Sequence, residues 1–368
     1  MVTLISLLVA FIIPLVYLYY GVYKRDFFQT GNTRLIIACF LWGAFAYLMA
    51  YGANSTLLKY HLISHDDLVR YSAPVLEEIL KGAILLYLIR RADFTYFVDG
   101  AIYGFTIGIG FAVFENMEYV LNARDPMFLA LARVFSTNLI HATTCGSIGI
   151  ALGLSRFERS GSTRRLTTLF ASVVIAMGLH VTYNNLVSRG APVLLAILVG
   201  FAGAGLIVYS IMRGMNDLKN WVNEELKEDR RVTVNEAAIV NQFEKVDSLL
   251  VPFSKRFGPQ KTALAREMLL MQAQMSIHRR TAEKHQDEKM RQAAEAQANE
   301  LRARMDVCRN QLGWYCMLQL RGMFPEEGNP WWDKMASLPQ APKEKAGTGV
   351  WSALNKKTEQ IAPNMEER

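Results

Sequence analysis

The sequence predicts an all-α protein, a polytopic bundle of about seven transmembrane helices followed by a C-terminal helical cytoplasmic domain. Two observations lead to this fold class. Up to about residue 213, apolar runs recur between short polar connections, and each run has the roughly 20 residues that a helix needs to cross a bilayer. Beyond residue 213 such runs are absent and charged residues are dense. The 368-residue chain is 51% apolar, so the prediction depends on how the apolar residues are distributed along it.

The membrane domain is predicted over residues 1–213. Its candidate spans are residues 2–20, 34–52, 71–89, 98–121, 128–154, 166–187 and 191–213. The first run lacks a basic segment before it and a small-residue cleavage site after it, so we interpret it as a retained helix and not as a signal peptide. The connections after spans one, three and five are the ones rich in lysine and arginine. Basic loops stay in the cytoplasm, which predicts an N-terminus outside and a cytoplasmic C-terminus.

The rest of the chain is predicted as two further regions. Residues 214–337 form a mainly helical cytoplasmic domain, because residues 260–311 contain no proline or glycine and are rich in strong helix formers. Residues 338–368 are rich in proline, lysine and glutamate and are predicted to be disordered. The long helical region suggests a homo-oligomer or a protein partner bound through residues 214–337.

Charge and cysteine content exclude two classes of function. The net charge of +7 is modest, and in a membrane protein it reports loop orientation and contact with the lipid bilayer, so we expect no nucleic-acid partner. The four cysteines have no CxxC spacing and are divided between membrane domain and tail, which argues against a thiolate zinc site and a disulfide framework.

The third span, residues 71–89, contains three charged side chains, Glu77, Glu78 and Lys81. Facing lipid, each would cost about 2.5 to 3.5 kcal/mol, so all three must face protein or water. Lys81 follows Glu77 by four residues and Glu78 by three, and on a helix these spacings place the lysine within reach of either carboxylate. The three side chains therefore mark an internal polar face.

Polar side chains also interrupt three other spans. The fourth contains Glu115 and Asn116, the fifth contains His141, and the sixth contains His180 with Asn184 one turn later on the same face. Glu118, close to the end of the fourth span, is interpreted as interfacial. Singly, each of these residues could form an ordinary hydrogen bond between helices. Because four helices contribute them together, we expect one shared polar cavity that holds water.

Two carboxylates and two imidazoles can activate water in two ways. Glu77 with His141 could act as a general base without metal. Alternatively a metal, with Zn²⁺ as the candidate, could be bound by His141, His180 and either Glu77 or Glu115. An HExxH motif is absent, which excludes a zincin, and no GxSxG motif points to a serine hydrolase.

These motifs resemble a known family. APVLEEILKG (residues 73–82), Asp99–Gly100 leading into GIGFAVFEN (108–116), His141 and the pair His180 and Asn184 are similar in order and spacing to PrsW-type intramembrane proteases. That family is related to the CAAX prenyl endopeptidases and belongs with the CPBP membrane proteases. The resemblance implies an active site inside the bilayer of a bacterial inner membrane. The implied substrates are membrane-anchored proteins such as single-pass anti-sigma factors.

The resemblance also implies roles for the motif residues. Glu77 is implied as the general base, with Glu78 and Lys81 holding its geometry. Glu115 is implied as an extra metal ligand or second acid, and Asn116 follows it in the same motif. His180 and Asn184 are implied to bind the oxyanion. The likeness to glutamate-dependent endopeptidases favours the metal-free mechanism over the metal-dependent one.

Two other classes of function compete with a protease. Buried Glu, Lys and His residues are equally ordinary in a proton-coupled transporter, but the sequence shows neither inverted repeats nor broken helices. A catalytically silent scaffold with a partner-binding tail is the second alternative. It is disfavoured because every motif residue is present.

Overall fold

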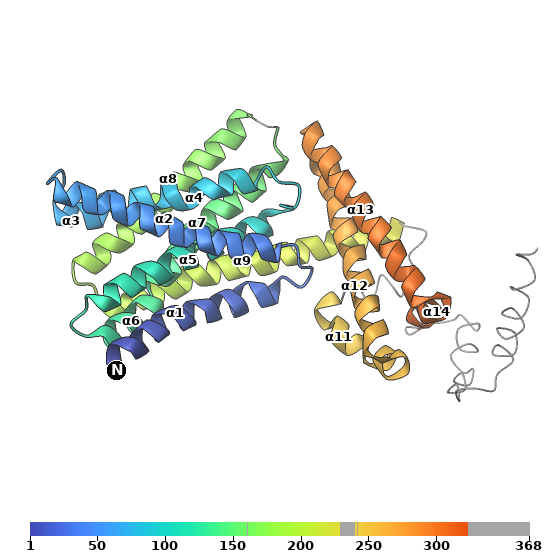
Figure 1. Cartoon of the computed structure of the whole chain (residues 1–368). Coiled ribbons are helices and arrows are strands. Elements are labelled where there is room, and N and C mark those ends of the chain that lie inside the picture. Colours follow the sequence, from blue (N-terminus) through green and yellow to red (C-terminus); the bar gives the residue numbers. More distant parts are fainter. Residues whose placement is uncertain (160, 229–239, 241, 323–368) are drawn as a thin grey trace, which may run out of the picture. The chain divides into compact units, whose positions relative to one another are not determined.

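The computed structural model describes residues 1–159, 161–228, 240 and 242–322, and every regular element in this part of the chain is a helix (Figure 1). The predicted all-α class is therefore confirmed. The first part of the chain contains α1 (Val2–Gly21), α2 (Thr33–Lys59), α3 (His65–Asp67), α4 (Ala73–Leu88), α5 (Phe97–Leu121), α6 (Pro126–Val134), α7 (Thr137–Leu154), α8 (Thr163–Ser188) and α9 (Val193–Glu228). The tail adds α11 (Val246–Leu249), α12 (Val251–Lys284), α13 (Glu288–Leu312) and α14 (Trp314–Gly322).

Five helices are long and apolar enough to cross a membrane, so the protein is a multi-pass membrane protein. They cover Val2–Arg25, Thr33–Lys59, Phe97–Leu121, Thr163–Ser188 and Val193–Leu226, and they match five of the seven predicted spans. The predicted span 71–89 corresponds to α4, which has 16 residues.

The prediction of one continuous helix over 128–154 is wrong. The chain forms α6 and α7 there, and the break falls at Phe135 and Ser136. The Ser136 hydroxyl donates to the carbonyl oxygen of Ala132 at 2.6 Å. A serine bonded back to the preceding turn bends a helix, and the Ser-Thr-Asn run at this point has weak helix propensity.

Helix α9 continues without a break through Arg213 to Glu228. The first residues of the predicted cytoplasmic domain, 214–228, are therefore a continuation of the last span. Residues 1–321 form one compact unit. The domain boundary at residue 213 stays a prediction, and the disorder predicted for 338–368 lies outside the described residues.

Helix α5 is the centre of the bundle, and 94% of the 18-residue apolar stretch within it is buried. Gly100, Gly104 and Gly108 lie at every fourth position on the face that packs against α7. A Cβ atom on each would lie 2.0 to 2.3 Å from a carbonyl oxygen of α7. Only glycine permits this approach, which is the usual way for membrane helices to pack closely. The opposite side of α5 packs equally closely on α2, where a Cβ on Gly110 would meet the Phe40 carbonyl oxygen at 2.2 Å.

The tail is built on a helical hairpin of α12 and α13, joined by a short connection. Gln274 of α12 donates through Nε2 to the carbonyl oxygens of Phe28 and Gln29, at 3.1 and 3.2 Å. Arg280 pairs with Glu224 of α9 at 3.1 Å. The hairpin is thus held both by the connection between α1 and α2 and by the end of α9.

Substitution Gly104→Ala should destabilise the protein by about 1 to 3 kcal/mol, because the new methyl group would meet the Cys145 carbonyl oxygen and force α5 and α7 apart. The loss is measured as a lower Tm in detergent. Gly178→Ala in α8 is the matched control, because no atom lies within 4 Å of its added Cβ. Equal Tm values for the two variants would contradict the close-packing argument.

Acid should weaken the packing of the tail through His285. This side chain is 6% exposed and lies against Phe157, with ring centroids 5.1 Å apart. Burial, together with Arg156, lowers the pKa of His285 from 6.5 to about 4. The folded state then binds fewer protons than the unfolded chain, so this contribution is complete above about pH 6.5 and is lost as pH falls toward 4. The difference in Tm between pH 7.5 and pH 5 should shrink in His285→Phe and stay unchanged in His61→Gln, whose side chain is exposed.

Candidate active site

Helix α4 carries Glu77, Glu78 and Lys81 on a buried face. The ammonium group of Lys81 lies 2.7 Å from Glu78 Oε1, and both side chains are completely buried. Thr144 of α7 donates to the same carboxylate oxygen at 2.9 Å. A buried charge is tolerated only with such partners, so Glu78 and Lys81 stabilise each other inside the bundle.

His180 of α8 is held by Glu78. Its Nδ1 lies 2.8 Å from Glu78 Oε1, while its Nε2 lies 3.9 Å from Glu77 Oε2. A carboxylate bonded to one nitrogen of an imidazole fixes the tautomer and the orientation of the ring. Glu78 therefore directs Nε2 of His180 toward Glu77.

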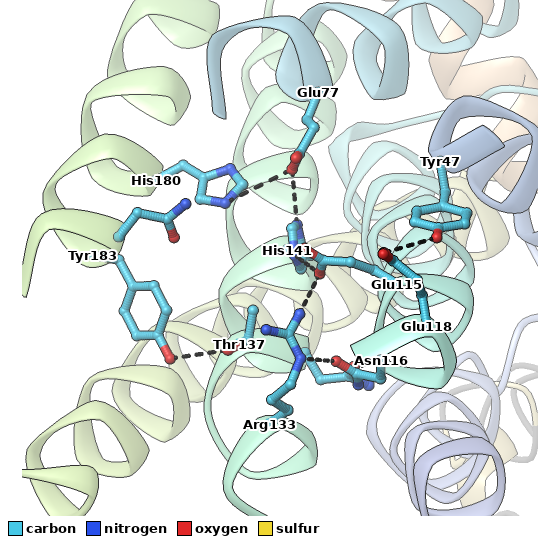
Figure 2. A network of polar contacts seen from close by, with 12 residues as sticks. Tyr47, Glu77, Glu115, Asn116, Glu118, Arg133, Thr137, His141, His180 and Tyr183 are labelled. Atoms are coloured by element: carbon cyan, nitrogen blue, oxygen red, sulfur yellow. Dashed lines mark hydrogen bonds and ion pairs between the residues drawn. The ribbon is translucent and has the colours of Figure 1, made fainter. Parts of the chain in front are cut away.

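His141 of α7 is held in the same way by Glu115 of α5. Its Nε2 lies 2.9 Å from Glu115 Oε2, and its Nδ1 lies 3.9 Å from Glu77 Oε2 (Figure 2). Lys81 Nζ lies 2.9 Å from the same Nδ1. The two histidine rings meet edge to face, with centroids 4.8 Å apart, and converge on Glu77.

The group Glu77, His141 and His180 fits a metal ion. Each residue offers one ligand atom, and the three atoms lie within 4.8 Å of one another. Glu77 Oε2 is buried and, within the described part of the chain, has no hydrogen-bond partner. A divalent cation would satisfy this oxygen, and two histidines with one carboxylate form a known zinc ligand set. Of the metal ligands predicted from the sequence, Glu77, His141 and His180 lie together. Glu115, the alternative carboxylate, instead bonds the far nitrogen of His141, Nε2.

Arg133 of α6 completes the site, although it is not among the residues predicted for it from the sequence. Its Nη2 lies 2.6 Å from Glu115 Oε2 and its Nε lies 2.7 Å from Asn116 Oδ1 (Figure 2). Its guanidinium carbon lies 3.9 Å from the Tyr119 ring centroid. An arginine inside the predicted span 128–154 was itself a signal, because an intramembrane charge is expensive. Arg133 neutralises the carboxylate that holds His141.

The two asparagines of the predicted set lie apart from each other. Asn116 is fully buried and donates to Asn138 of α7, so it belongs to the Arg133 side of the network. Asn184 donates through Nδ2 to the Val69 carbonyl oxygen at 2.9 Å. It also lines a cavity beside the site, one turn from His180.

A cavity of about 280 Å³ leads to the site. It is bounded by the second half of α2, the residues between α3 and α4, and the end of α5. Glu77, Glu115 and Asn184 contribute to its wall. Since water occupies about 30 Å³, the cavity has room for several water molecules or for an extended stretch of chain.

A family of known proteins matches the part of the chain that contains this site. Residues 31–215, half of the chain, match the model of the PrsW family intramembrane metalloproteases. The chain belongs to the PrsW family. All eight residues predicted for the site lie inside the matched range, and the tail lies almost entirely outside it.

Curated relatives agree with this membership. The chain is 26% identical to Protease PrsW of Clostridioides difficile over 225 residues, which are 59% of this chain and 91% of the relative. It is 27% identical to Protease PrsW of Bacillus subtilis over 164 residues, or 44% of this chain and 73% of the relative. No solved structure matches the chain significantly.

PrsW membership makes the protein an intramembrane metalloprotease. This membership argues against the two alternatives considered from the sequence, a transporter and a catalytically silent scaffold. The metalloprotease description and the convergence of Glu77, His141 and His180 also favour the metal-dependent mechanism over the metal-free one that the sequence alone favoured.

Substitution Arg133→Gln in this PrsW site should destabilise the protein, because the buried carboxylate of Glu115 would lose its cation. The double variant Glu115→Gln/Arg133→Gln should recover part of the loss, with a coupling of about 1 to 3 kcal/mol measured by a double-mutant cycle of unfolding in detergent. Arg280→Gln, which breaks exposed pairs, is the control and should cost less than about 1 kcal/mol. Strictly additive losses at 115 and 133 would contradict the pairing.

Proposed function

We propose that this protein cuts membrane-anchored proteins inside the bilayer, with Glu77, His141 and His180 at the reacting centre. The observation that carries the proposal is the unpartnered Glu77 Oε2, which both histidine rings approach at 3.9 Å beside a cavity. The family membership supplies the class of reaction, which is peptide-bond hydrolysis. The centre is buried, so the bond to be cut must enter the bundle.

We further propose that α4 and α7 lie within the bilayer beside the five spans, giving seven. Helix α4 is short, with 16 residues, and carries three charged residues of the site, while α7 carries His141. Polar residues that face the inside of a bundle do not require contact with lipid. The loop charges support an orientation with the N-terminus outside and the tail in the cytoplasm. The cavity is bounded by the end of α5 and the second half of α2, which face the outer side in this orientation. The bacterial relatives support a bacterial inner membrane.

The ligands would be Glu77 Oε2, His141 Nδ1 and His180 Nε2, with Zn²⁺ as the metal. When bound, it would polarise the substrate carbonyl and acidify a water molecule. Glu78 and Glu115 each hold the far nitrogen of one histidine, so the near nitrogen presents its lone pair to the centre. Lys81 currently lies 2.9 Å from His141 Nδ1, and this contact must be released before His141 can act as a ligand.

The chain's own residues account for the proton and the substrate oxygen. Glu77 accepts a proton from water as the water oxygen adds to the carbonyl carbon, and it does so through Oε1, the carboxylate oxygen that is not assigned to the metal. The same proton reaches the leaving amine as the carbon–nitrogen bond breaks. Asn184, on the cavity wall, is the neutral donor that we propose for the developing oxyanion.

The substrate class that we propose is a single-pass membrane protein of the anti-sigma-factor type. The support is the resemblance of the motifs, and the buried position of the centre agrees with it. The helical tail, residues 214–337, is proposed to bind a partner or a second copy of the chain.

Metal content and cleavage of a single-pass reporter protein should be measured on the same purified samples. Wild type should carry about one zinc per chain, and His141→Ala and His180→Ala should lose it because each removes one of three ligands. Glu77→Gln should cut the reporter at least 10²-fold more slowly. The exposed variant His61→Ala is the control and should match wild type.

The outcomes separate the two mechanisms. Cleavage by a metal-free wild type that resists chelators would sink the metal centre and leave Glu77 as a bare base. Full activity in Glu77→Gln would remove this glutamate from the chemistry altogether.

A further inference from the structure

The cavity beside the reacting centre has an acidic wall. Among the described residues that line it are three acidic side chains, Glu77, Glu115 and Glu118, and one histidine, His65, and no lysine or arginine lines it. Glu77 belongs to the reacting centre, and Glu115 is neutralised by Arg133 at 2.6 Å. Glu118 is therefore a negative charge in the cavity wall that the mechanism does not use.

Glu118 is held in place by a neutral partner. Its Oε2 accepts a hydrogen bond from the hydroxyl of Tyr47 at 3.1 Å, and Tyr47 is 8% exposed (Figure 2). Within the described chain no lysine or arginine forms an ion pair with Glu118, whereas Glu78 and Glu115 each have one. A fixed, half-buried carboxylate without a cation is arranged to receive one from outside the chain.

The neighbouring side chains add what a cation needs. Asn54 lines the same cavity, and its Oδ1 is buried without a hydrogen-bond partner. The cavity wall also contains the rings of Tyr47, Tyr51 and Tyr119. Carbonyl and carboxylate oxygens accept hydrogen bonds, and aromatic faces attract cations. Several acceptors beside flat rings suit the five N–H groups of a planar guanidinium better than one ammonium group.

We propose that Glu118, Asn54 and Tyr47 form a specificity subsite that binds an arginine side chain of the substrate, with lysine as the weaker alternative. This inference rests on the proposed protease function and names a property of its substrates. Glu118 lies three residues beyond Glu115, about 4.5 Å along α5, and both line the same cavity as Glu77. An extended peptide advances about 3.3 Å per residue, so we place the arginine within about three residues of the bond that is cut.

The test uses single-pass reporters that differ only at one position near the cleavage site. A set with arginine at each of three positions on either side finds the position, and glutamine and glutamate are then placed there. Wild type should prefer arginine over glutamine by at least about tenfold in kcat/KM, because the glutamine leaves Glu118 unpaired. Glu118→Gln should lose this preference, and Glu118→Arg should reverse it in favour of glutamate.

Each preference is a ratio measured on one preparation, so a variant that is only partly folded gives the same ratio. Tyr47→Phe keeps the ring but frees the carboxylate, and it should reduce the preference. Asp66→Asn is the matched control, because Asp66 is exposed, does not line the cavity and loses the same charge. It should leave the preference unchanged.

Binding separates this inference from the proposed function. The affinity of the same reporters is measured for Glu77→Gln and for Glu77→Gln/Glu118→Gln, neither of which needs to cleave. Equal affinity for arginine and glutamine reporters would overturn the subsite whatever the cleavage assay shows. A preference that depends on Glu118, with no cleavage by wild type, would keep the subsite and remove the protease function.

A lipid ammonium group is the other source of such a cation. Binding is therefore compared in detergent alone and with added phosphatidylethanolamine. A preference for arginine that persists supports a peptide site. A preference that disappears on addition of this lipid assigns the subsite to the headgroup and overturns the substrate assignment.

Discussion

The backbone contact between α5 and α7 is the constraint on which the site depends. At Gly108, α5 approaches the backbone of α7 at His141 so closely that an added Cβ would lie 2.2 Å from the His141 carbonyl oxygen. Glu115 follows Gly108 by two turns on α5, and from there its carboxylate reaches Nε2 of the same histidine at 2.9 Å. Any larger side chain in the glycine stripe would separate the helices and lengthen this bond. The glycines therefore act on the chemistry through the position of one imidazole.

The sequence predicts that the residues proposed for the centre of this site meet in one place, for a physical reason. Glu77, His141 and His180 lie in long apolar runs, where a polar group is so costly to bury that it must meet another. Arg133, Tyr47 and Glu118 were missed or interpreted differently, because their importance lies in pairs formed between helices. Periodicity along one helix does not show which neighbour its side chains meet. The same limit applies to the metal, since one set of residues serves either mechanism.

Continuity of α9 connects the site to the tail. Gly200 lies against Ser136 and Gly203 against Thr143, so α9 packs on the part of α7 that carries His141. The same helix continues to Glu228, where Glu224 pairs with Arg280 of α12. The apolar run ends near residue 213, while the helix itself continues. The end of an apolar run therefore does not mark the end of a helix here.

The distribution of partners among the buried acids separates the roles of the carboxylates. Glu78 is paired with Lys81 and Glu115 with Arg133, and each also holds a histidine, so these two acids are fixed structural anions. Such pairs contribute little net stability, because desolvation offsets most of their attraction. What they provide is orientation of the two imidazoles. Glu77 and Glu118 have no cation at hydrogen-bonding distance in the described chain, and both line the cavity. Of the acids in this cavity, the two that lack an internal cation are therefore the two positioned to meet a ligand, one at the reacting bond and one beside it.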